Sequence, residues 1–539
     1  MNLTGSNDDK IIHVPKSDYV PDPRGLGYTL FYCMQKHKDK IAQIDGITGE
    51  TDTYTSLLQR CVRTAIKMRC LGVTPNDIIS TCTFTRLDSC VPYLATLFLG
   101  AKIANFDPTL SLQDTVHLMK QVTPKIIFVI PETLDVIKNA VKELNKQITI
   151  VVFGSTDEHT PFSEFLKPSL EESLFKPHEI SDLKETAIIF FSSGTSGLPK
   201  GICISHYGFM HQQMNLANMG FCLDINVGFS SLYWITPSAF LSTTTFLGVA
   251  RLVVPKFDAS IIWTAIKKFK PTFVYGIPVH LLTMYDTKPI NVDVSCVKQL
   301  LVGGGQLLKN QIIKIRSIFP KAQLCTAYGQ TEMAVMISIS RPNQVNFEKF
   351  ALEKPTYCGV GVPGISYKVV DIDTEEILGP NQPGELRLRT DYCLNGYYNM
   401  DASDCWDKDG WYRTWDLVYY DEDKCFYVVD RLKEFLKYQS WHVPPSLLEN
   451  ILRTHQDVAN AVIIGVPHDL DECHFMGLVV LKNRNSKVTP EELEKFVEER
   501  VDDRKRLRGG VKIIEKIPLM ETGKLQRRKI RDMYLRGEI

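Results

Sequence analysis

The sequence shows no excess of charge of either sign. Its 539 residues include 62 lysines and arginines and 62 aspartates and glutamates, so the formal net charge is 0. A protein that binds nucleic acid or an acidic membrane through its overall field carries a basic excess. The balance argues against both classes of protein, and we expect no nucleic-acid partner.

The chain also lacks paired cysteines and long apolar runs. Its 14 cysteines are scattered without a Cys-x-x-Cys pair, which argues against a disulfide scaffold and a cysteine-based metal site. The longest apolar runs are much shorter than a membrane span, so we expect no transmembrane segment. The first 20 residues lack the apolar core of a signal peptide, and residues 536–539 are not the Ser-Lys-Leu peroxisomal signal. We therefore expect a cytoplasmic protein.

Length and pattern predict more than one domain. A chain of 539 residues is too long for a single hydrophobic core. Between about residues 26 and 185, helical stretches such as 53–71 alternate with short β-rich runs such as 125–130 and 148–153. This alternation predicts a parallel sheet wrapped by helices.

The stretch over residues 186–201 carries the strongest chemical signal. It begins as an apolar run at 187–191 and then breaks into hydroxyl residues and glycines, which predicts a buried strand that delivers a loop to a sheet edge. Hydroxyls donate hydrogen bonds, glycines let backbone N–H groups turn toward an anion, and a lysine adds positive charge. The candidate polyphosphate-binding residues are Ser192, Ser193, Gly194, Thr195, Ser196, Gly197 and Lys200.

This loop is not a P-loop. That motif places its lysine directly after the last glycine, whereas Leu198 and Pro199 separate Gly197 from Lys200 here. An ordinary Ser/Gly-rich connection is the alternative interpretation. A helix predicted over residues 205–219 would bring its N-terminus beside the loop and add its dipole to phosphate binding.

Further strand ends carry residues suited to a nucleotide. Residues 300–306 form an apolar strand that ends in three glycines, which by itself is also typical of a tight strand–helix turn. Residues 324–332 deliver Tyr328, Thr331 and Glu332 to a cleft, or else form an exposed turn with one carboxylate. An ATP site needs an aromatic face for adenine, a hydroxyl for the α-phosphate and a carboxylate for Mg²⁺.

Together with segments at 409–416 and 428–437, these stretches resemble, in order, the signature motifs of the adenylate-forming enzymes. That family includes acyl-CoA synthetases, 4-coumarate:CoA ligases and beetle luciferases, and the resemblance covers nearly the whole chain. It implies an α/β fold with a large N-terminal domain of wrapped parallel sheets, residues 1–430, including a β-subdomain over about 355–430. A hinge would join it to a small α+β C-terminal domain, residues 431–539. The elements expected there are helices at 445–454 and 489–501 and strands at 459–466, 476–482 and 511–518.

The resemblance also implies roles for individual residues. Asp416 would accept hydrogen bonds from the ribose hydroxyls, Glu332 would bind Mg²⁺, and Lys433 would be the hinge pivot. Lys524 would serve adenylation and Lys437 the thiol step. The implied catalytic residues are Lys524, Lys437, Thr331 and Glu332. The implied nucleotide-binding residues are the 192–197 loop, Lys200, Gly304, Gly305, Tyr328, Gly329, Asp416 and Arg431. The implied substrate-pocket residues are Trp234, Ile235, Gly303, Gln330 and Met336, and Ser440 and Trp441 would lie along the CoA path.

At some positions the sequence departs from the family pattern. Trp234 or Ile235 stands where relatives often have a histidine that orients the substrate. Trp415 and Ser440 each replace a glycine, beside the ribose carboxylate and beside the pantetheine path. The family's frequent peroxisomal signal is also missing, although the resemblance leaves a peroxisomal location open.

The function implied is ATP-dependent activation of a fatty or aryl acid to an acyl-adenylate, followed by transfer to CoA, with ATP, Mg²⁺ and CoA as cofactors. A luciferase-like monooxygenase would use the same residues. The departures at Ile235, Trp415 and Ser440 also allow an adenylation-fold binding protein with weak or lost turnover. The spacing around Leu198 disfavours a generic P-loop ATPase. The acid and the oligomeric state are not specified by the sequence.

Overall fold

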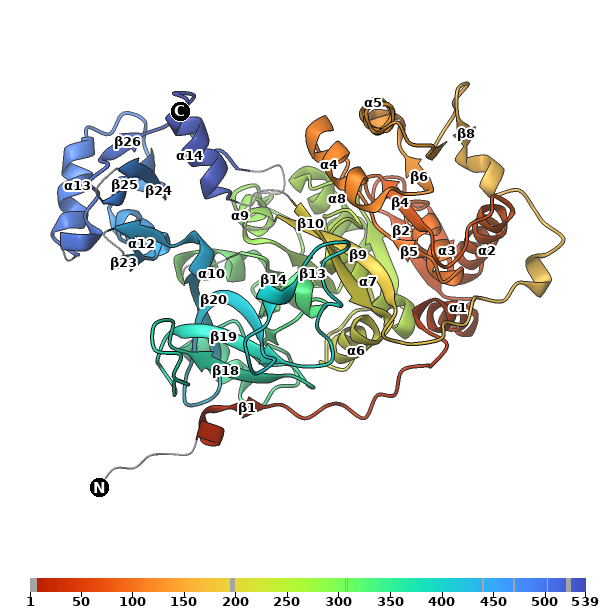
Figure 1. Ribbon diagram of the computed structural model, residues 1–539, viewed down its shortest axis with the longest axis horizontal. Helices are drawn as coiled ribbons and strands as arrows, with labels where there is room; N and C mark the ends of the chain where they lie inside the picture. The colour runs from red at the N-terminus through yellow and green to blue at the C-terminus, as the bar shows by residue number, and fades with distance from the viewer. Residues whose placement is uncertain are drawn as a thin grey trace.

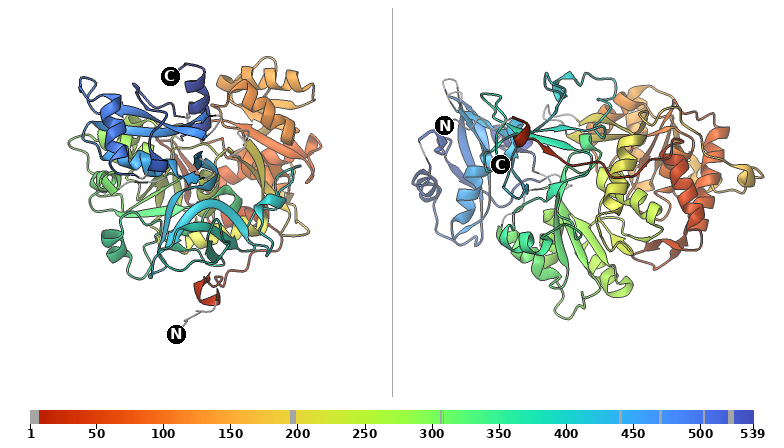
Figure 2. Two further views of the ribbon diagram at one scale, coloured as in Figure 1. Left: turned by 60° about the vertical axis from the view of Figure 1, so that its left-hand side comes forward. Right: turned by 90° about the horizontal axis from the view of Figure 1, so that it is seen from below.

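The structure is a computed structural model, which describes residues 7–193, 199–305, 307, 309–438, 441–468, 471–501, 503–519 and 525–539. The described residues form a large α/β part built on three sheets and a smaller part that holds the C-terminus (Figure 1). The right-hand view of Figure 2 also places the smaller part, drawn in blue, at one end of the molecule. The expected α/β fold with a large N-terminal and a smaller C-terminal domain is confirmed.

The first sheet is parallel except at one edge. Its strands lie in the order β10, β9, β5, β4, β6, β7, β8, and only the β10–β9 pair is antiparallel among the described pairs. The strand bounds are β4 Ile78–Cys82, β5 Lys102–Ile103, β6 Ile126–Val129, β7 Thr149–Val152, β8 Thr160–Pro161, β9 Thr186–Ser193 and β10 Pro199–Ser205. The helices of this region are α1 Leu26–Lys36, α2 Tyr54–Cys70, α3 Val91–Phe98, α4 Leu112–Val122 and α5 Leu134–Leu144.

The second sheet is parallel through its centre, in the order β15, β14, β13, β11, β12, β2, and is flanked by antiparallel β16, β17 and β3. Its strands are β2 Ile41–Asp45, β3 Thr51–Thr53, β11 Ile225–Val227, β12 Ala250–Val253, β13 Phe273–Gly276, β14 Gln299–Gly303, β15 Gln323–Tyr328, β16 Ser338–Ile339 and β17 Val360–Gly361. The neighbouring helices are α6 His206–Ala217, α7 Ile235–Leu247, α8 Ala259–Phe269, α9 Pro278–Asp286, α10 Lys309–Ile318 and α11 Phe347–Glu353.

The third sheet is antiparallel and brings distant segments together. Strand β1 (Ile12–His13) crosses from the N-terminal segment to pair with β18 (Ser366–Val370), as the red trace along the lower edge of Figure 1 shows. The sheet continues through β19 (Gly384–Arg389), β20 (Tyr412–Tyr420) and β21 (Phe426–Arg431). Two of the charged residues of β19 are not solvated, because Glu385 and Arg387 are 1% and 3% exposed and form an ion pair at 2.8 Å.

The smaller part is an α+β unit. Its strands are β22 Leu436–Tyr438, β23 Trp441–Val443, β24 Val458–His468, β25 Glu472–Leu481 and β26 Val511–Ile513, and its helices are α12 Pro445–Thr454, α13 Pro490–Glu498 and α14 Arg527–Leu535. A capping box of Thr489 and Glu492 opens α13, in which each side chain accepts a backbone N–H of the other residue, and the helix begins within one residue of the predicted start at 489. The expected strand at 511–518 is shorter, ending at Ile513.

One expectation about phosphate binding is wrong. The chain returns from the 194–198 segment as strand β10, which pairs antiparallel with β9 so that Ser205 lies opposite Thr186. Strand β10 has 7 residues, so the N-terminus of α6 lies roughly 20 Å from the loop end of the hairpin. The α6 dipole therefore cannot contribute to phosphate binding at the loop. The sequence prediction missed β10 because its Pro199 and Gly201 look like loop residues.

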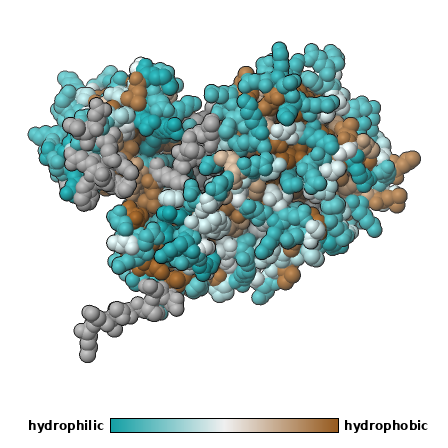
Figure 3. Space-filling view, viewed as in Figure 1, coloured by the Kyte–Doolittle hydropathy of each residue, from teal (hydrophilic) through white to brown (hydrophobic). Residues whose placement is uncertain are grey.

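The structure also shows the hydropathy of the surface and of the described helices. On the face seen in Figure 3 the surface is largely hydrophilic, with small hydrophobic patches, and an indentation separates the smaller part from the large one. Among the helices that the structure describes, none has the length and apolarity to cross a membrane. All 14 cysteines are free thiols.

Candidate active site

A cavity of about 600 Å³ lies where the carboxyl ends of the two parallel sheets face each other. From the first sheet it takes Phe84 and Asp107, which follow β4 and β5, and Phe191 near the end of β9. Ligands of parallel α/β sheets bind in the crevice outside the carboxyl ends of the strands. The position of the cavity therefore follows from the topology of the sheets.

The second sheet forms the long wall of the cavity. Tyr328 ends β15, Gly303 ends β14, Gly276 ends β13, and Phe229 and Phe257 follow β11 and β12. Neighbouring strands lie about 4.8 Å apart, so the ends of β15 and β12 are separated by roughly 19 Å. The cavity can thus hold two chemically different groups side by side along the sheet edge.

Most predicted site residues that the structure describes line this cavity. They are Lys200, Trp234, Ile235, Gly303, Gly304, Tyr328, Gly329, Gln330, Thr331, Glu332, Met336, Asp416 and Arg431. Gly305 is not among the lining residues. Gly194, Thr195, Ser196, Gly197, Ser440 and Lys524 lie outside the described residues, as do the side chains of Ser192, Ser193, Lys433, Lys437 and Trp441.

One end of the cavity, the polar end, is organised around Asp416. The hydroxyl of Tyr328 and the amide nitrogen of Gln330 both donate to Asp416 Oδ2, at 2.5 and 2.7 Å. Tyr412 donates in turn to Gln330 Oε1 at 2.9 Å, and Arg431 Nε lies 3.4 Å from Asp416 Oδ1. The strands fix this geometry, because Asp416 and Arg431 are paired across β20 and β21.

Burial and charge act in opposite directions on this carboxyl. Asp416 is only 2% exposed, and burial raises its pKa, whereas the Arg431 guanidinium opposes that rise. The Asp416 carboxylate in turn raises the pKa of Arg431. A buried carboxylate with oriented donors and a cation is a strong hydrogen-bond acceptor for a ligand hydroxyl.

Trp415 adopts an unusual backbone conformation beside Asp416. Its φ is 56°, in the left-handed region that favours glycine, at a bulge where β20 shifts register against β19. The Arg413 guanidinium lies 4.0 Å from the centroid of the Trp415 ring, and both residues line the cavity. The large residue in the family's glycine position is therefore accommodated as part of the wall.

The segment from Gly329 to Met336 is held in a strained turn. Ala334 and Val335 have φ values of 51° and 126°, which are rare for a β-branched residue such as valine. A Cβ on Gly329 would lie 1.8 Å from the Val335 carbonyl oxygen, so this position requires glycine.

Gln212 of α6 fixes this turn from outside the cavity. It is fully buried, and its amide nitrogen donates to the Met333 and Met336 carbonyls at 2.8 Å each. The sequence analysis missed Gln212, because a single glutamine in a helix carries no motif.

The other end of the cavity, the aromatic end, is formed by Phe229, Phe257 and His280. The His280 ring stacks on Phe257 at 4.2 Å between centroids, and Phe229 meets both rings edge-on. Burial lowers the pKa of His280 to about 4, so its imidazole is neutral near pH 7. Sequence reasoning missed all three residues, since they lie on separate segments with no motif between them.

Small residues separate the two ends. Gly304 has a φ of 77°, and a Cβ there would lie 3.2 Å from the Ile277 side chain.

Trp234 is the N-cap residue of α7 and Ile235 its first residue, so both are placed by a helix that the sequence analysis did not predict.

Lys200 enters the cavity from the edge of the first sheet. It lies opposite Ser192 in the β9–β10 hairpin, and its Nζ is 4.9 Å from the centroid of the Tyr397 ring. Gln121 of α4 anchors the strand, donating to the Pro199 carbonyl and accepting from the Gly201 N–H. A lysine on a rigid strand beside the Glu332 segment suits a polyanionic ligand.

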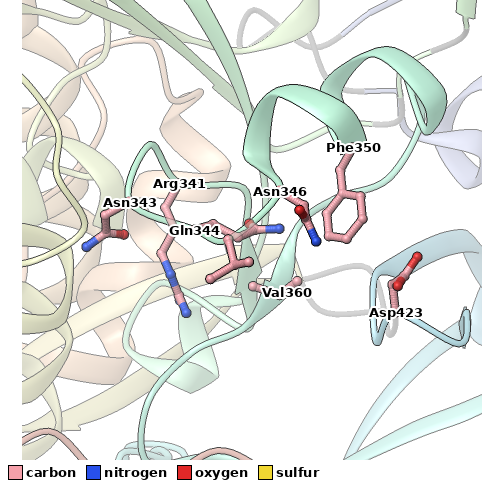
Figure 4. A pocket seen from close by; sticks show the side chains of 8 residues that line it. Arg341, Asn343, Gln344, Asn346, Phe350, Val360 and Asp423 are labelled. Atoms are coloured by element: carbon pink, nitrogen blue, oxygen red, sulfur yellow. The ribbon is translucent and has the colours of Figure 1, made fainter.

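A second depression, of about 410 Å³, lies between α11 and the turn that carries Asp423 (Figure 4). Its polar lining is mainly Arg341 and the amides Asn343, Gln344 and Asn346. Its acid, Asp423, and its aromatic ring, Phe350, are both engaged by Lys354, whose Nζ lies 2.5 Å from Asp423 Oδ2 and 4.5 Å from the centroid of the Phe350 ring. The cavity at the sheet ends is therefore the candidate active site.

Comparison with known proteins gives matches along the chain. The sequence model of the AMP-binding enzyme family matches residues 30–398, and that of the AMP-binding enzyme C-terminal domain matches residues 447–524.

Individual relatives cover the same span. A luciferin 4-monooxygenase of Nipponoluciola cruciata is 28% identical over 98% of each chain, and 4-coumarate–CoA ligase 2 of Petroselinum crispum is 28% identical over 97% of this chain and 96% of that one. The solved structure of the luciferase-like enzyme from the nonluminescent mealworm Zophobas morio is 36% identical, with a TM-score of 0.75 over 79% of this chain and 100% of that one.

Proposed function

Because the chain belongs to the AMP-binding enzyme family, we propose that it activates a carboxylic acid with ATP and passes the acyl group to the thiol of CoA. The observation that supports this most is the single cavity, which joins a polar end with a buried acceptor carboxylate to an end lined by aromatic rings. Adenylation needs a nucleotide site and an acid site that open into each other, so that the carboxylate can reach the α-phosphate.

The nucleotide is proposed to occupy the polar end. Asp416, oriented by Tyr328 and Gln330, would accept hydrogen bonds from the ribose hydroxyls. Arg431 would then serve both Asp416 and a phosphate, since its side chain is 53% exposed beside the carboxylate. The Tyr328 ring, which also lines the cavity, would contact adenine.

The phosphates are proposed to lie between Lys200 and the Thr331–Glu332 turn. Lys200 is a fixed positive charge for the leaving pyrophosphate, and Thr331 offers a hydroxyl to the α-phosphate. The Glu332 carboxylate is the oxygen ligand that Mg²⁺ prefers, and the metal would supply charge neutralisation on the phosphates. Catalysis at this site is positioning and electrostatic stabilisation, with no general base required.

The acid is proposed to extend toward the aromatic end. Its carboxylate oxygen would attack the α-phosphorus as the bond to pyrophosphate breaks, while its organic group packs against Phe229, Phe257 and His280. The aromatic lining favours an aryl or otherwise planar acid over a flexible chain, and neutral His280 can hydrogen-bond a polar substituent.

The thiol step is proposed to require movement of the smaller domain about Lys433. Lys524 would serve adenylation and Lys437 the approach of CoA, each presented to the cavity in a different orientation of the smaller domain.

A screen of carboxylic acids with ATP, Mg²⁺ and CoA, read by mass spectrometry for acyl-AMP and acyl-CoA, tests this proposal. We expect both products from one class of planar acid. Absence of acyl-AMP across aryl and fatty acids would contradict it and favour a binding protein with lost turnover.

A monooxygenase is the second candidate, because luciferin 4-monooxygenases match 98% of the chain. It predicts light and an oxidised product when preformed luciferyl-adenylate meets O₂ in the protein. A dark reaction that yields only the thioester in the presence of CoA would exclude it.

A further inference from the structure

Three metal-ligand side chains converge outside the cavity, where strands β24 and β25 meet. His468, Asp471 and His474 each offer a ligand atom, and these atoms all lie within 4.8 Å of one another. Asp471 Oδ2 is 2.8 Å from His474 Nε2 and 3.4 Å from His468 Nδ1. Among the described residues, no other set of three His, Cys, Asp or Glu side chains converges in this way.

The strand register explains why the two histidines meet. His468 pairs with Glu472 and Val466 pairs with His474, so the histidines are diagonal neighbours on one face of the hairpin. Their rings stack at 3.9 Å between centroids. Cys473 belongs to the opposite face, where its Sγ lies close to Gly465, and is not part of the cluster.

From this arrangement we propose that His468, Asp471 and His474 form a binding site for a late first-row divalent cation, with Zn²⁺ as the reference ion. Two imidazole nitrogens and one carboxylate oxygen are ligands that such cations prefer, whereas Mg²⁺ and Ca²⁺ prefer oxygen alone. Ligand atoms around a tetrahedral zinc ion with bonds of 2.0–2.1 Å lie about 3.3 Å apart. The observed separations of 2.8 and 3.4 Å are close to this value, and the two stacked rings would tilt apart so that the in-plane lone pair of each points at one ion.

The site is open to an entering ion. The side chains of His468, His474 and Asp471 are 39%, 23% and 18% exposed, which leaves room for water at the remaining coordination position. Without metal, the same groups form hydrogen bonds with one another. His474 Nε2 lies 2.8 Å from Asp471 Oδ2, and the Asp471 backbone N–H donates to His468 Nδ1 at 3.2 Å. A plain hydrogen-bonded cluster is the competing explanation, and metal binding must displace these contacts.

Metal binding would restrict the β24–β25 hairpin beside strand β22. Tyr438 of β22 pairs with Glu472, and its ring centroid lies 6.3 Å from that of His474. Strand β22 also contains Lys437, the residue proposed for the thiol step. The metal site itself does not depend on that proposal.

Zinc binding to the tag-free, chelator-treated full chain tests the inference. Titration calorimetry and metal analysis after dialysis should find one equivalent of Zn²⁺ bound to the wild type and absent from the His468→Ala/His474→Ala double variant. His455→Ala, which removes a histidine of the same domain that faces Asp457 at 3.8 Å, should bind zinc as the wild type does. Equal zinc binding by the wild type and the double variant, or none by either, would overturn the proposal.

A second readout guards against a variant that simply misfolds. Zn²⁺ should raise the Tm of the wild type and of His455→Ala, and leave that of the double variant unchanged. Bound Co²⁺ should show the visible absorption of a nitrogen- and oxygen-ligated ion in the wild type, and Asp471→Asn should weaken its binding at least about tenfold. A double variant with native circular dichroism and an unaltered Co²⁺ spectrum would contradict the site.

Discussion

The two ends of the cavity are built on different physical principles. At the polar end, Tyr328, Gln330 and Arg431 converge on one buried carboxylate through hydrogen bonds and charge. At the aromatic end, Phe229, Phe257 and His280 contact one another only through their ring faces and edges. Directional contacts permit few substitutions, whereas ring packing tolerates exchange at similar volume. We infer that the polar end determines the reaction and the aromatic end determines which acid reacts.

Among variants of the two ends of the cavity, the largest effect should follow from Asp416→Asn. The substitution keeps the shape but removes the charge that Arg431 faces, and a hydrogen bond to a charged group contributes about 1.5–3 kcal/mol. We expect the KM for ATP to rise roughly 10- to 100-fold, with little change in the preference among acids. Steady-state kinetics would show this, with the exposed Asp373→Asn as the control. An altered preference among acids at an unchanged KM for ATP would contradict the inference that the two ends have separate roles.

The next effect concerns the support of the polar end. Gln212→Leu leaves the buried carbonyls of Met333 and Met336 without their donor, at a cost of about 1–3 kcal/mol each in the free energy of unfolding. We expect a lower urea midpoint and a kcat reduced about tenfold or more, because the Thr331–Glu332 turn loses its position. Gln212→Glu preserves the size and one acceptor but not the donor, so it should not rescue. A wild-type kcat in either variant would show that the turn keeps its conformation without the hydrogen bonds from Gln212.

These two predictions illustrate what could be read from the sequence. Tyr328, Glu332 and Asp416 stand in short motifs with fixed spacing, so local sequence sufficed to bring them to one cavity. Their mutual bonds, and Gln212 beneath them, depend on strands β15, β20 and helix α6 meeting in space, which no local pattern encodes. The aromatic end could not be predicted from the sequence for the same reason, because each of its three rings comes from a different segment.

The fold shows the same division. Helices with strong caps, such as α2 after Thr53 and α13 after Thr489, were predicted within a residue or two at their starts, because capping is local. Strand β10 was missed, and with it the true distance from the loop to α6, because an edge strand is stabilised by its partner β9. The proposed domain boundary at residue 430 and the hinge at Lys433 stay predictions.

At the aromatic end, His280→Phe should change selectivity without touching ATP. Phenylalanine can keep the stack on Phe257 but cannot hydrogen-bond a polar substituent. We expect kcat/KM to fall severalfold for acids with a distal hydroxyl relative to unsubstituted analogues, as one lost neutral hydrogen bond of about 0.5–1.5 kcal/mol implies. The KM for ATP should stay constant, and a matching rise for ATP would contradict the separation of the ends.

The same variant should alter acid stability. Burial lowers the pKa of His280 from 6.5 to about 4. Between these two values the His280 side chain is protonated in the unfolded chain and neutral in the folded chain. The stability from the neutral histidine is present above pH 6.5 and is lost as the pH falls toward 4, by about 2 kcal/mol between pH 6.5 and 5. Urea unfolding at pH 7 and 5 should show a smaller drop for His280→Phe. His206 and His211 have pKa values lowered to about 4 in the same way, so part of the drop should persist.

The smallest effect is expected for Trp415→Gly. Glycine relieves the left-handed backbone, worth about 1–2 kcal/mol, but loses the stacking of Arg413 and some chain rigidity. We expect a net change in the free energy of unfolding within about 1 kcal/mol and less than a threefold change in the KM for ATP. A larger loss of ATP binding would make Trp415 a nucleotide contact, and the polar end would then extend beyond the Asp416 cluster.

The central claim is that the polar end and the aromatic end act together in one adenylation. Exchange of labelled pyrophosphate into ATP tests this most directly, because it reports reversal of acyl-adenylate formation without CoA or O₂. We predict exchange that depends on an added planar acid and falls about 10²–10³-fold or more in Lys524→Ala, while ATP binding and the exchange of the exposed-lysine control Lys516→Ala are retained. ATP binding with no acid-dependent exchange in the wild type would contradict the account.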